Sequence, residues 1–181
     1  MDRATSKTAP QPRRGATLLY VLFALAAFCG LVSLAVDYGH VQVVKTQLQT
    51  AADAAARAGV NSLASGTASA QNNAVQTAAA NIAGGQKVVL NTSTDVEFGS
   101  WDKTFRTFTV LTGSAASSAN ALRITARRSN AAGNPVKLYF ASLFGLNSCD
   151  VVVSSTASRT PSPSLSELSQ TSPTPFPLVS R

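Results

Sequence analysis

The sequence predicts an α+β fold with a long N-terminal helix, a second helix and then a mostly antiparallel sheet. Three observations predict it. An uncharged apolar segment covers residues 16–36, small apolar residues then recur at helical spacing to about residue 83, and apolar and polar residues alternate from residue 86 onward. Helices followed by a series of short strands are typical of α+β domains, in which helices cover one face of the sheet.

The long helix is expected to begin as a transmembrane segment. Residues 16–36 read ATLLYVLFALAAFCGLVSLAV and contain no charged residue. A helix of this length is about 30 Å long, which matches the hydrocarbon core of a bilayer. Arg13 and Arg14 precede the segment, and Asp37 follows it. Because positive residues stay in the cytoplasm, we expect residues 1–15 to be a basic cytoplasmic tail and residues 37–158 to form an extracytoplasmic domain.

A cleavable signal peptide is the alternative interpretation of this segment. Ser33-Leu34-Ala35 resembles a small-x-small cleavage site. Signal peptides usually have an apolar region of about 7–15 residues, however, which is shorter than this one. In both interpretations, everything after Asp37 is exported. We expect the Asp37 carboxylate to be solvated among the lipid headgroups.

Beyond the apolar segment, a seam of mostly small side chains predicts that the helix continues, amphipathic and rich in alanine, to about Leu63. An alternating spacing of three and four residues places the seam on one helix face. Alanine buries little area but lets another backbone approach closely, so the seam is expected to pack on a sheet of the same domain or on neighbouring copies. Its members are Val41, Val44, Leu48, Ala51, Ala55 and Ala58.

The remaining elements follow from changes in periodicity. A second helix is predicted over about 68–83, ended by Gly84-Gly85. Strands are predicted at 95–101 and 104–111 as a hairpin, at 121–128 with Leu122, Ile124 and Ala126 facing inward, and at 150–157. Residues 136–144 fit either a strand or a short helix. Residues 159–181 are rich in serine and proline, which predicts a disordered tail.

Charge and residue types argue against several functions. The formal net charge is +7, but four of the bases precede residue 16, so the exported part is only mildly basic and nucleic acid is not an expected partner. His40 is the single histidine, which disfavours a catalytic triad or a zinc site. Asp95, Glu97 and Asp102 are interpreted as outward-facing hairpin charges, with a weak calcium site as the alternative. We therefore predict no catalytic, metal or cofactor-binding residue and no enzyme activity.

Several motifs together resemble the TadG-like proteins of the tight-adherence (Flp) pilus assembly family, whose N-terminal region is shared with TadE-like proteins. The motifs are RRGA at 13–16, the apolar segment, AVDYGH at 35–40 and LQTAADAAARAGV at 48–60, with weaker similarity at GSWD (99–102), NALRITARRS (120–129) and YFASLFGL (139–146). The residues that carry the family pattern are Asp37, Gly39, Leu48, Gln49, Ala52 and Asp53.

The resemblance implies a non-catalytic, single-pass protein of the bacterial inner membrane that assists assembly or anchoring of an adhesive pilus. Its expected partners are the lipid bilayer, other Tad/Flp assembly proteins and other copies of itself. A pilin-like arrangement is expected, and a pilin-like subunit that polymerises through its N-terminal helix is one alternative function. That alternative needs cleavage after Gly15, but Tyr20 stands where related pseudopilins carry glutamate. The other alternative is an anchored extracytoplasmic binding module.

Overall fold

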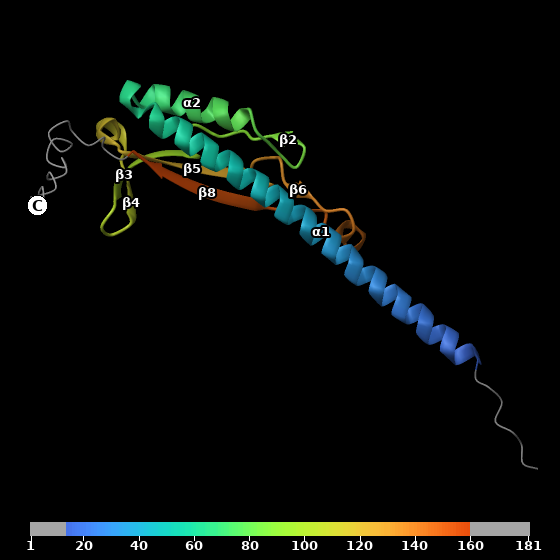
Figure 1. Cartoon of the computed structure of the whole chain (residues 1–181). Helices are drawn as coiled ribbons and strands as arrows, with labels where there is room; N and C mark the ends of the chain where they lie inside the picture. The colour runs from blue at the N-terminus through green and yellow to red at the C-terminus, as the bar shows by residue number, and fades with distance from the viewer. Residues whose placement is uncertain (1–13, 160–181) are drawn as a thin grey trace, which may run out of the picture. The chain divides into compact units, whose positions relative to one another are not determined.

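The structure, a computed structural model, describes residues 14–159 and has the predicted α+β class (Figure 1). A long N-terminal helix is followed by a second helix and then by antiparallel strands, as the sequence predicts. The described residues divide into two compact units, one made of 14–46 and 128–151 and the other of 47–127 and 152–159. The predicted cytoplasmic tail and the predicted disordered tail lie almost entirely outside the described residues.

Helix α1 runs without interruption from Arg14 to Asn61 and contributes residues to both units. It contains no proline, and its many alanine and leucine residues have high helix propensity. The helix continues through Gly39 and ends close to the predicted Leu63. A short 3₁₀ turn, η1, follows at Leu63–Ser65.

The unit of 47–127 and 152–159 contains a four-stranded sheet in the order β4-β3-β5-β8. Its strands are β3 (Val96–Asp102), β4 (Thr107–Val110), β5 (Ala121–Arg128) and β8 (Val151–Ser158). β3 pairs antiparallel with β4, with Trp101 opposite Phe108, and antiparallel with β5, with Phe98 opposite Leu122. The predicted hairpin and the predicted strand at 121–128 are therefore confirmed.

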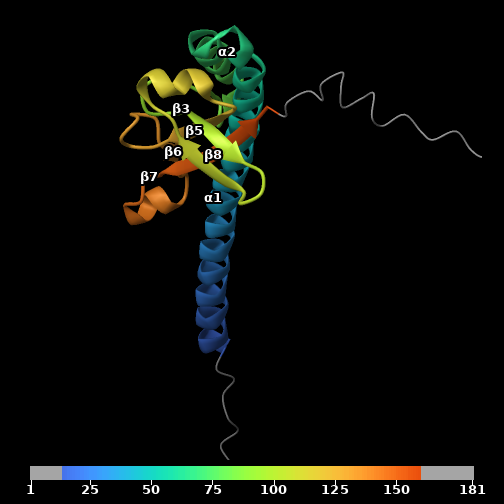
Figure 2. The same cartoon turned by 90° about the vertical axis from the view of Figure 1, so that its left-hand side faces the viewer.

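The core of this unit consists of small helix residues packed near larger strand residues. Helix α2 (Thr67–Ala79) lies beside the last turns of α1 in both cartoon views (Figures 1 and 2). Gly59 makes this close approach possible, because a Cβ there would lie 2.2 Å from Leu122 Cδ2 and 3.2 Å from the Ala70 carbonyl oxygen. The residues of this core with zero exposed surface include Leu48, Ala51, Ala55, Ala70, Ala74, Ala78, Leu122, Ile124 and Ala126.

The second helix ends earlier than the sequence predicts. α2 stops at Ala79, and Ile82–Ala83 form strand β1, which pairs antiparallel with β2 (Gln86–Lys87). Gly84 and Gly85 both have positive φ, at 58° and 77°, as a two-residue hairpin loop requires. The two glycines therefore form the turn of a small hairpin instead of ending the helix directly.

In the other unit, residues 128–151 form a compact segment of two short strands and a 3₁₀ turn beside α1. β6 (Val136–Lys137) pairs antiparallel with β7 (Ser148–Cys149), and the 3₁₀ turn η3 (Ala141–Phe144) lies between them. Arg128 Nε donates to the Asn134 carbonyl oxygen at 2.6 Å, and Asn130 N donates to Asp150 Oδ1 at 2.9 Å. Residues 136–144 thus contain both of the structures that the sequence allowed, a short strand and a short helical turn.

Candidate functional site

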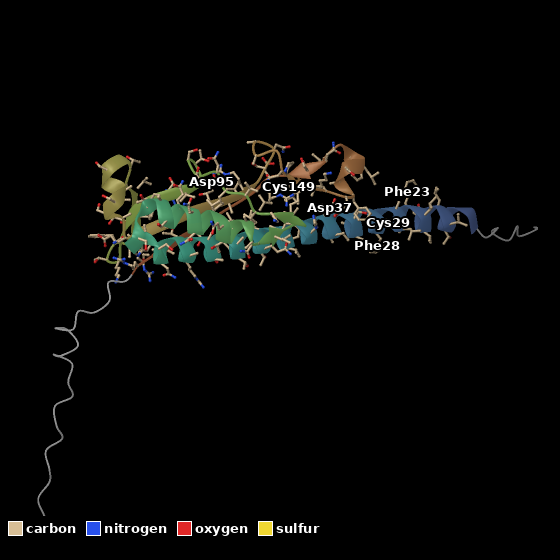
Figure 3. All side chains as sticks on the ribbon, turned by 90° about the horizontal axis from the view of Figure 1, so that it is seen from above. Phe23, Phe28, Cys29, Asp37, Asp95 and Cys149 are labelled. Carbon is tan, nitrogen blue, oxygen red and sulfur yellow. The ribbon has the colours of Figure 1, made fainter. Side chains whose placement is uncertain are left out.

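The first part of α1 is an apolar helix that the rest of the described chain leaves uncovered. Its most apolar 18-residue window has a mean hydropathy of 2.5, and 0% of that window is buried. Leu18 is 72% exposed, Phe23 67% and Leu34 65%. Figure 3 shows Phe23 and Phe28 pointing outward from this helix. The helix is long and apolar enough to cross a membrane, although a signal sequence has the same properties.

Asp37, directly after the apolar segment, is buried and bound to backbone groups far away in the sequence. Only 3% of the residue is exposed. Its Oδ1 accepts the N–H of Tyr139 at 2.8 Å, and its Oδ2 accepts those of Phe140 at 3.0 Å and Ala141 at 2.6 Å. We call this arrangement the Asp37 clamp. The expectation of a carboxylate solvated among headgroups was wrong, because neighbouring backbone donors replace water.

The clamp satisfies groups that would otherwise lack partners. Residues 139–141 lead into η3, and the first N–H groups of a helical turn have no partner inside that turn. A carboxylate at this position accepts them and interacts favourably with their aligned dipoles. Burial raises the pKa of Asp37, but the N–H groups of Ala141, Tyr139 and Phe140 together with the charge of His40 lower it below the ordinary value of 3.8.

His40, one turn after Asp37, adds a second contact to the same segment. Its ring lies 5.2 Å from the ring of Tyr139, centroid to centroid, in an edge-on arrangement. The sequence disfavoured a catalytic triad or a zinc site at this histidine and indicated no partner for it. Asp37 and His40 together hold Tyr139 against the helix at the point where the apolar segment ends.

Further along α1, the predicted seam lies mostly in the protein interior. Val44, Leu48, Ala51 and Ala55 are at most 1% exposed, whereas Val41 and Ala58 are half-buried. Ala52 and Ala56 are also fully buried. The buried face is therefore wider than the predicted seam of period 3.5. A helix packed inside a domain usually buries a broader stripe, and a prediction of such a stripe would have included these two alanines.

A family model covers the apolar helix, Asp37 and the buried face. Residues 15–81 match the TadE/G-like family. The model is named Tad and described as "Putative Flp pilus-assembly TadE/G-like". The match confirms the predicted resemblance over residues 15–81, which we call the TadE/G-like segment, whereas the weaker similarities at 99–102, 120–129 and 139–146 lie outside it. No curated protein and no solved structure matches the chain, so the pilin-like arrangement stays a prediction.

Within the TadE/G-like segment, the motif residues have different surroundings. Leu48 and Ala52 are fully buried. Gln49 Nε2 donates to Asp53 Oδ1 at 3.0 Å and to the Ser154 carbonyl oxygen at 3.4 Å, which links α1 to β8. Gly39 is exposed, and a Cβ there would meet nothing within 4 Å, so packing inside the described chain does not explain this glycine.

The acidic residues near the β3–β4 hairpin bind arginines or backbone groups. Asp95 Oδ1 lies 2.5 Å from Arg127 Nη2, and Glu97 Oε2 lies 2.7 Å from Arg123 Nε. Asp102 Oδ1 accepts the N–H of Thr104 at 2.7 Å, within the turn. The description of Asp95 as an outward-facing charge was wrong, because only 3% of it is exposed. Among residues 14–159, no cluster of three or more His, Cys, Asp or Glu could hold a metal ion.

Proposed function

We propose that the protein is a single-pass, membrane-anchored component of Flp pilus assembly, whose exported domain packs against other assembly proteins and has no catalytic role. The family match supports a part in Flp pilus assembly and an N-terminal helix that anchors in the membrane. The observation that carries the proposal is the continuity of α1. One helix joins an uncovered apolar segment to residues with a buried alanine face, all within the TadE/G-like segment.

The proposed topology places the protein in the bacterial inner membrane with its N-terminus in the cytoplasm. Residues 1–15 form the cytoplasmic tail, residues 16–36 the span, residues 37–158 the extracytoplasmic domain, and residues 159–181 a tail. Arg13 and Arg14 hold the N-terminal end inside, because positive residues next to a span remain cytoplasmic. Their side chains lie outside the described part of the structure.

Cysteine labelling tests this topology. In a background with Cys29→Ser and Cys149→Ser, Ala131→Cys places a thiol on an exposed residue of the exported domain, and Ser6→Cys places one in the tail. A membrane-impermeant maleimide should label the first variant in intact spheroplasts and the second only after lysis. Labelling in the reverse pattern would contradict the orientation. Recovery of the full-length chain in the soluble fraction would contradict the anchor.

The assembly role is tested in a piliated host. Deleting the gene should reduce the number of surface pili seen by electron microscopy and reduce adhesion, and the full-length gene should restore both. A complementing variant with Leu25→Arg, which places a charge within the apolar segment, should fail to restore them, whereas Leu25→Ile should succeed. Unchanged pili and adhesion after deletion would count against an assembly role.

A pilin-like subunit is the second candidate, favoured by the uninterrupted 48-residue helix α1. A subunit of this kind would polymerise through the apolar part of α1 after cleavage between Gly15 and Ala16. Mass spectrometry of the native protein distinguishes the two functions. An N-terminus at Ala16, together with recovery of the chain from sheared pili, would favour the subunit, whereas an intact N-terminus would favour the anchored component.

A further inference from the structure

Residues 139–146 form a turn whose large apolar side chains are exposed. Leu143 and Phe144 are each 81% exposed, Leu146 64% and Tyr139 63%. Phe140 adds a fifth large apolar side chain at 40% exposure, and η3 within the turn has no buried residue. We call residues 139–146 the apolar turn. Surface loops are usually polar, so a concentration of apolar side chains on a loop indicates that something covers it.

The apolar turn lies beside the end of the proposed span. The three hydrogen bonds of the Asp37 clamp join residues 139–141 to the first residue after the apolar segment. The ring contact between His40 and Tyr139 adds a second attachment of residues 139–146 to α1, one helical turn after Asp37. In Figure 2 the darker orange coil of this turn is the part of residues 128–151 that reaches furthest toward the blue, N-terminal part of α1. Anchoring by residues 16–36 would therefore place the turn at the level where lipid headgroups meet the acyl chains.

The composition of the turn suits that position. Residues 138–147 read LYFASLFGLN and contain no charged residue. Tyrosine and other aromatic residues are enriched at membrane interfaces, where one end of the ring is apolar and the other is wet. Tyr38, next to Asp37 on α1, is also 65% exposed and lies at the same level of the helix.

The backbone of the turn is also suited to a medium with little water. Leu143 N donates to the Phe140 carbonyl oxygen at 3.0 Å, and Leu146 N donates to that of Ala141 at 3.1 Å. Gly145 N donates to the Ser142 carbonyl oxygen at 3.1 Å, and the Ser142 hydroxyl donates to that of Tyr139 at 2.6 Å. With the clamp accepting the N–H groups of 139–141, the backbone N–H groups of residues 139–141, 143, 145 and 146 all have protein acceptors. Backbone donors next to lipid must be satisfied in this way, because an unpaired group there is costly.

We propose that the apolar turn inserts into the lipid interface of the extracytoplasmic leaflet and forms a second membrane contact beside the span. The inference rests on the proposed membrane anchor and goes beyond it. A single helix allows a domain to rotate and tilt about one point, whereas two contacts restrict both motions. Residues 128–151 would then be held against the bilayer in a defined orientation. The Asp37 clamp is the link that joins the two contacts.

Depth-dependent fluorescence quenching tests the proposal on the full-length protein in phosphatidylcholine vesicles. The native Trp101 is replaced by Trp101→Phe, and a single reporter is then introduced by Phe144→Trp in the turn. Two matched variants carry the reporter elsewhere: Phe28→Trp lies in the span, and Ala131→Trp lies on an exposed loop of the same unit. Brominated phosphatidylcholines report contact with lipid, and aqueous iodide reports contact with water. Leu143→Trp repeats the measurement at a second exposed position of the turn.

The Phe144→Trp and Leu143→Trp reporters should emit at shorter wavelength than the Ala131→Trp reporter. Bromines near the headgroup should quench most of their fluorescence, and deep bromines should quench less of it. The Phe28→Trp reporter should respond most to deep bromines, and the Ala131→Trp reporter only to iodide. If the turn reporters respond to iodide while the span reporter responds to bromines, the second contact is refuted and the anchor stands. If the turn reporters are shielded from both quenchers, protein covers the turn and the lipid proposal is equally refuted. If the span reporter shows no lipid contact, the anchor and the second contact both fail.

Discussion

Asp37 Oδ2 accepts the backbone N–H of Ala141 at 2.6 Å, although 104 residues separate them in the sequence. The carboxylate also accepts the N–H groups of Tyr139 and Phe140, so one side chain satisfies three consecutive donors. Such charge-assisted bonds are shorter and stronger than bonds between neutral groups. The position of the apolar turn therefore depends on a residue at the end of the apolar segment.

Replacing Asp37 by asparagine should release the apolar turn. Asparagine has nearly the same shape but turns an NH₂ donor toward the backbone N–H donors, so at most one oxygen remains to accept them. Amide hydrogen exchange of residues 139–141, measured in lipid nanodiscs, should accelerate on the order of tenfold or more. Asp102→Asn, at an exposed turn of the other unit, is the matched control and should leave these amides unchanged. Unaltered exchange in Asp37→Asn would show that the clamp does not hold the turn.

Acid should weaken the clamp. Burial acts to raise the pKa of Asp37, but the N–H donors and His40 together lower it below 3.8 in the folded protein. The unfolded chain therefore binds a proton at higher pH than the folded chain does, and stability from Asp37 is fully present above the unfolded pKa. This contribution should decline as the pH falls below 3.8 toward the folded pKa. The difference in thermal stability between the wild type and Asp37→Asn, measured against pH, should shrink in that range. A difference that is constant or grows with acid would contradict the lowered pKa.

A side chain at Gly59 should destabilise the packing of α1 against α2 and β5. An added Cβ would lie 2.2 Å from Leu122 Cδ2, and Leu122 has no exposed surface, so its side chain has little room to move. Overpacking of this kind costs about 1–3 kcal/mol, and we expect Gly59→Val to fall in the upper half of that range. Gly39→Ala on the same helix is the matched control, since a Cβ there meets nothing within 4 Å. It should be neutral or stabilise by up to about 1 kcal/mol, through helix propensity. Thermal unfolding in detergent measures the stability of both variants. Equal changes in stability for Gly59→Val and Gly39→Ala would contradict the packing argument.

The ion pair between Asp95 and Arg127 should contribute more to the free energy of unfolding than the one between Glu97 and Arg123. The Asp95 side chain is 3% exposed, whereas the side chains of Glu97 and Arg123 are both about one-third exposed. Arg127→Met would leave a buried carboxylate without its cation, at a cost of about 3 kcal/mol in unfolding free energy. Arg123→Met, the matched control, should cost about 1 kcal/mol or less. Chemical denaturation of the two variants makes the comparison, and similar losses would show that burial does not decide the strength of these pairs.

Elements with strong local periodicity could be predicted from the sequence. The strand at 121–128 has the predicted bounds and the predicted inward face of Leu122, Ile124 and Ala126, since alternation directly reports which side of a strand is buried. The end of α2 could not be predicted in this way. Gly84-Gly85 is compatible with a helix stop and with a hairpin turn, and pairing between Ile82–Ala83 and Gln86–Lys87 decides between them.

By itself, the sequence determined the apolar segment, the continuation of α1, the α+β order of elements and the resemblance to TadE/G-like proteins. These features depend on composition and on residues a few positions apart, which local chain geometry relates directly to a helix or a strand. Only the tertiary structure decided the role of Asp37, the partner of Asp95 and the width of the buried face of α1. Each depends on donors, cations or packing surfaces supplied by distant residues. No local sequence pattern specifies which distant residue makes the contact in the folded chain.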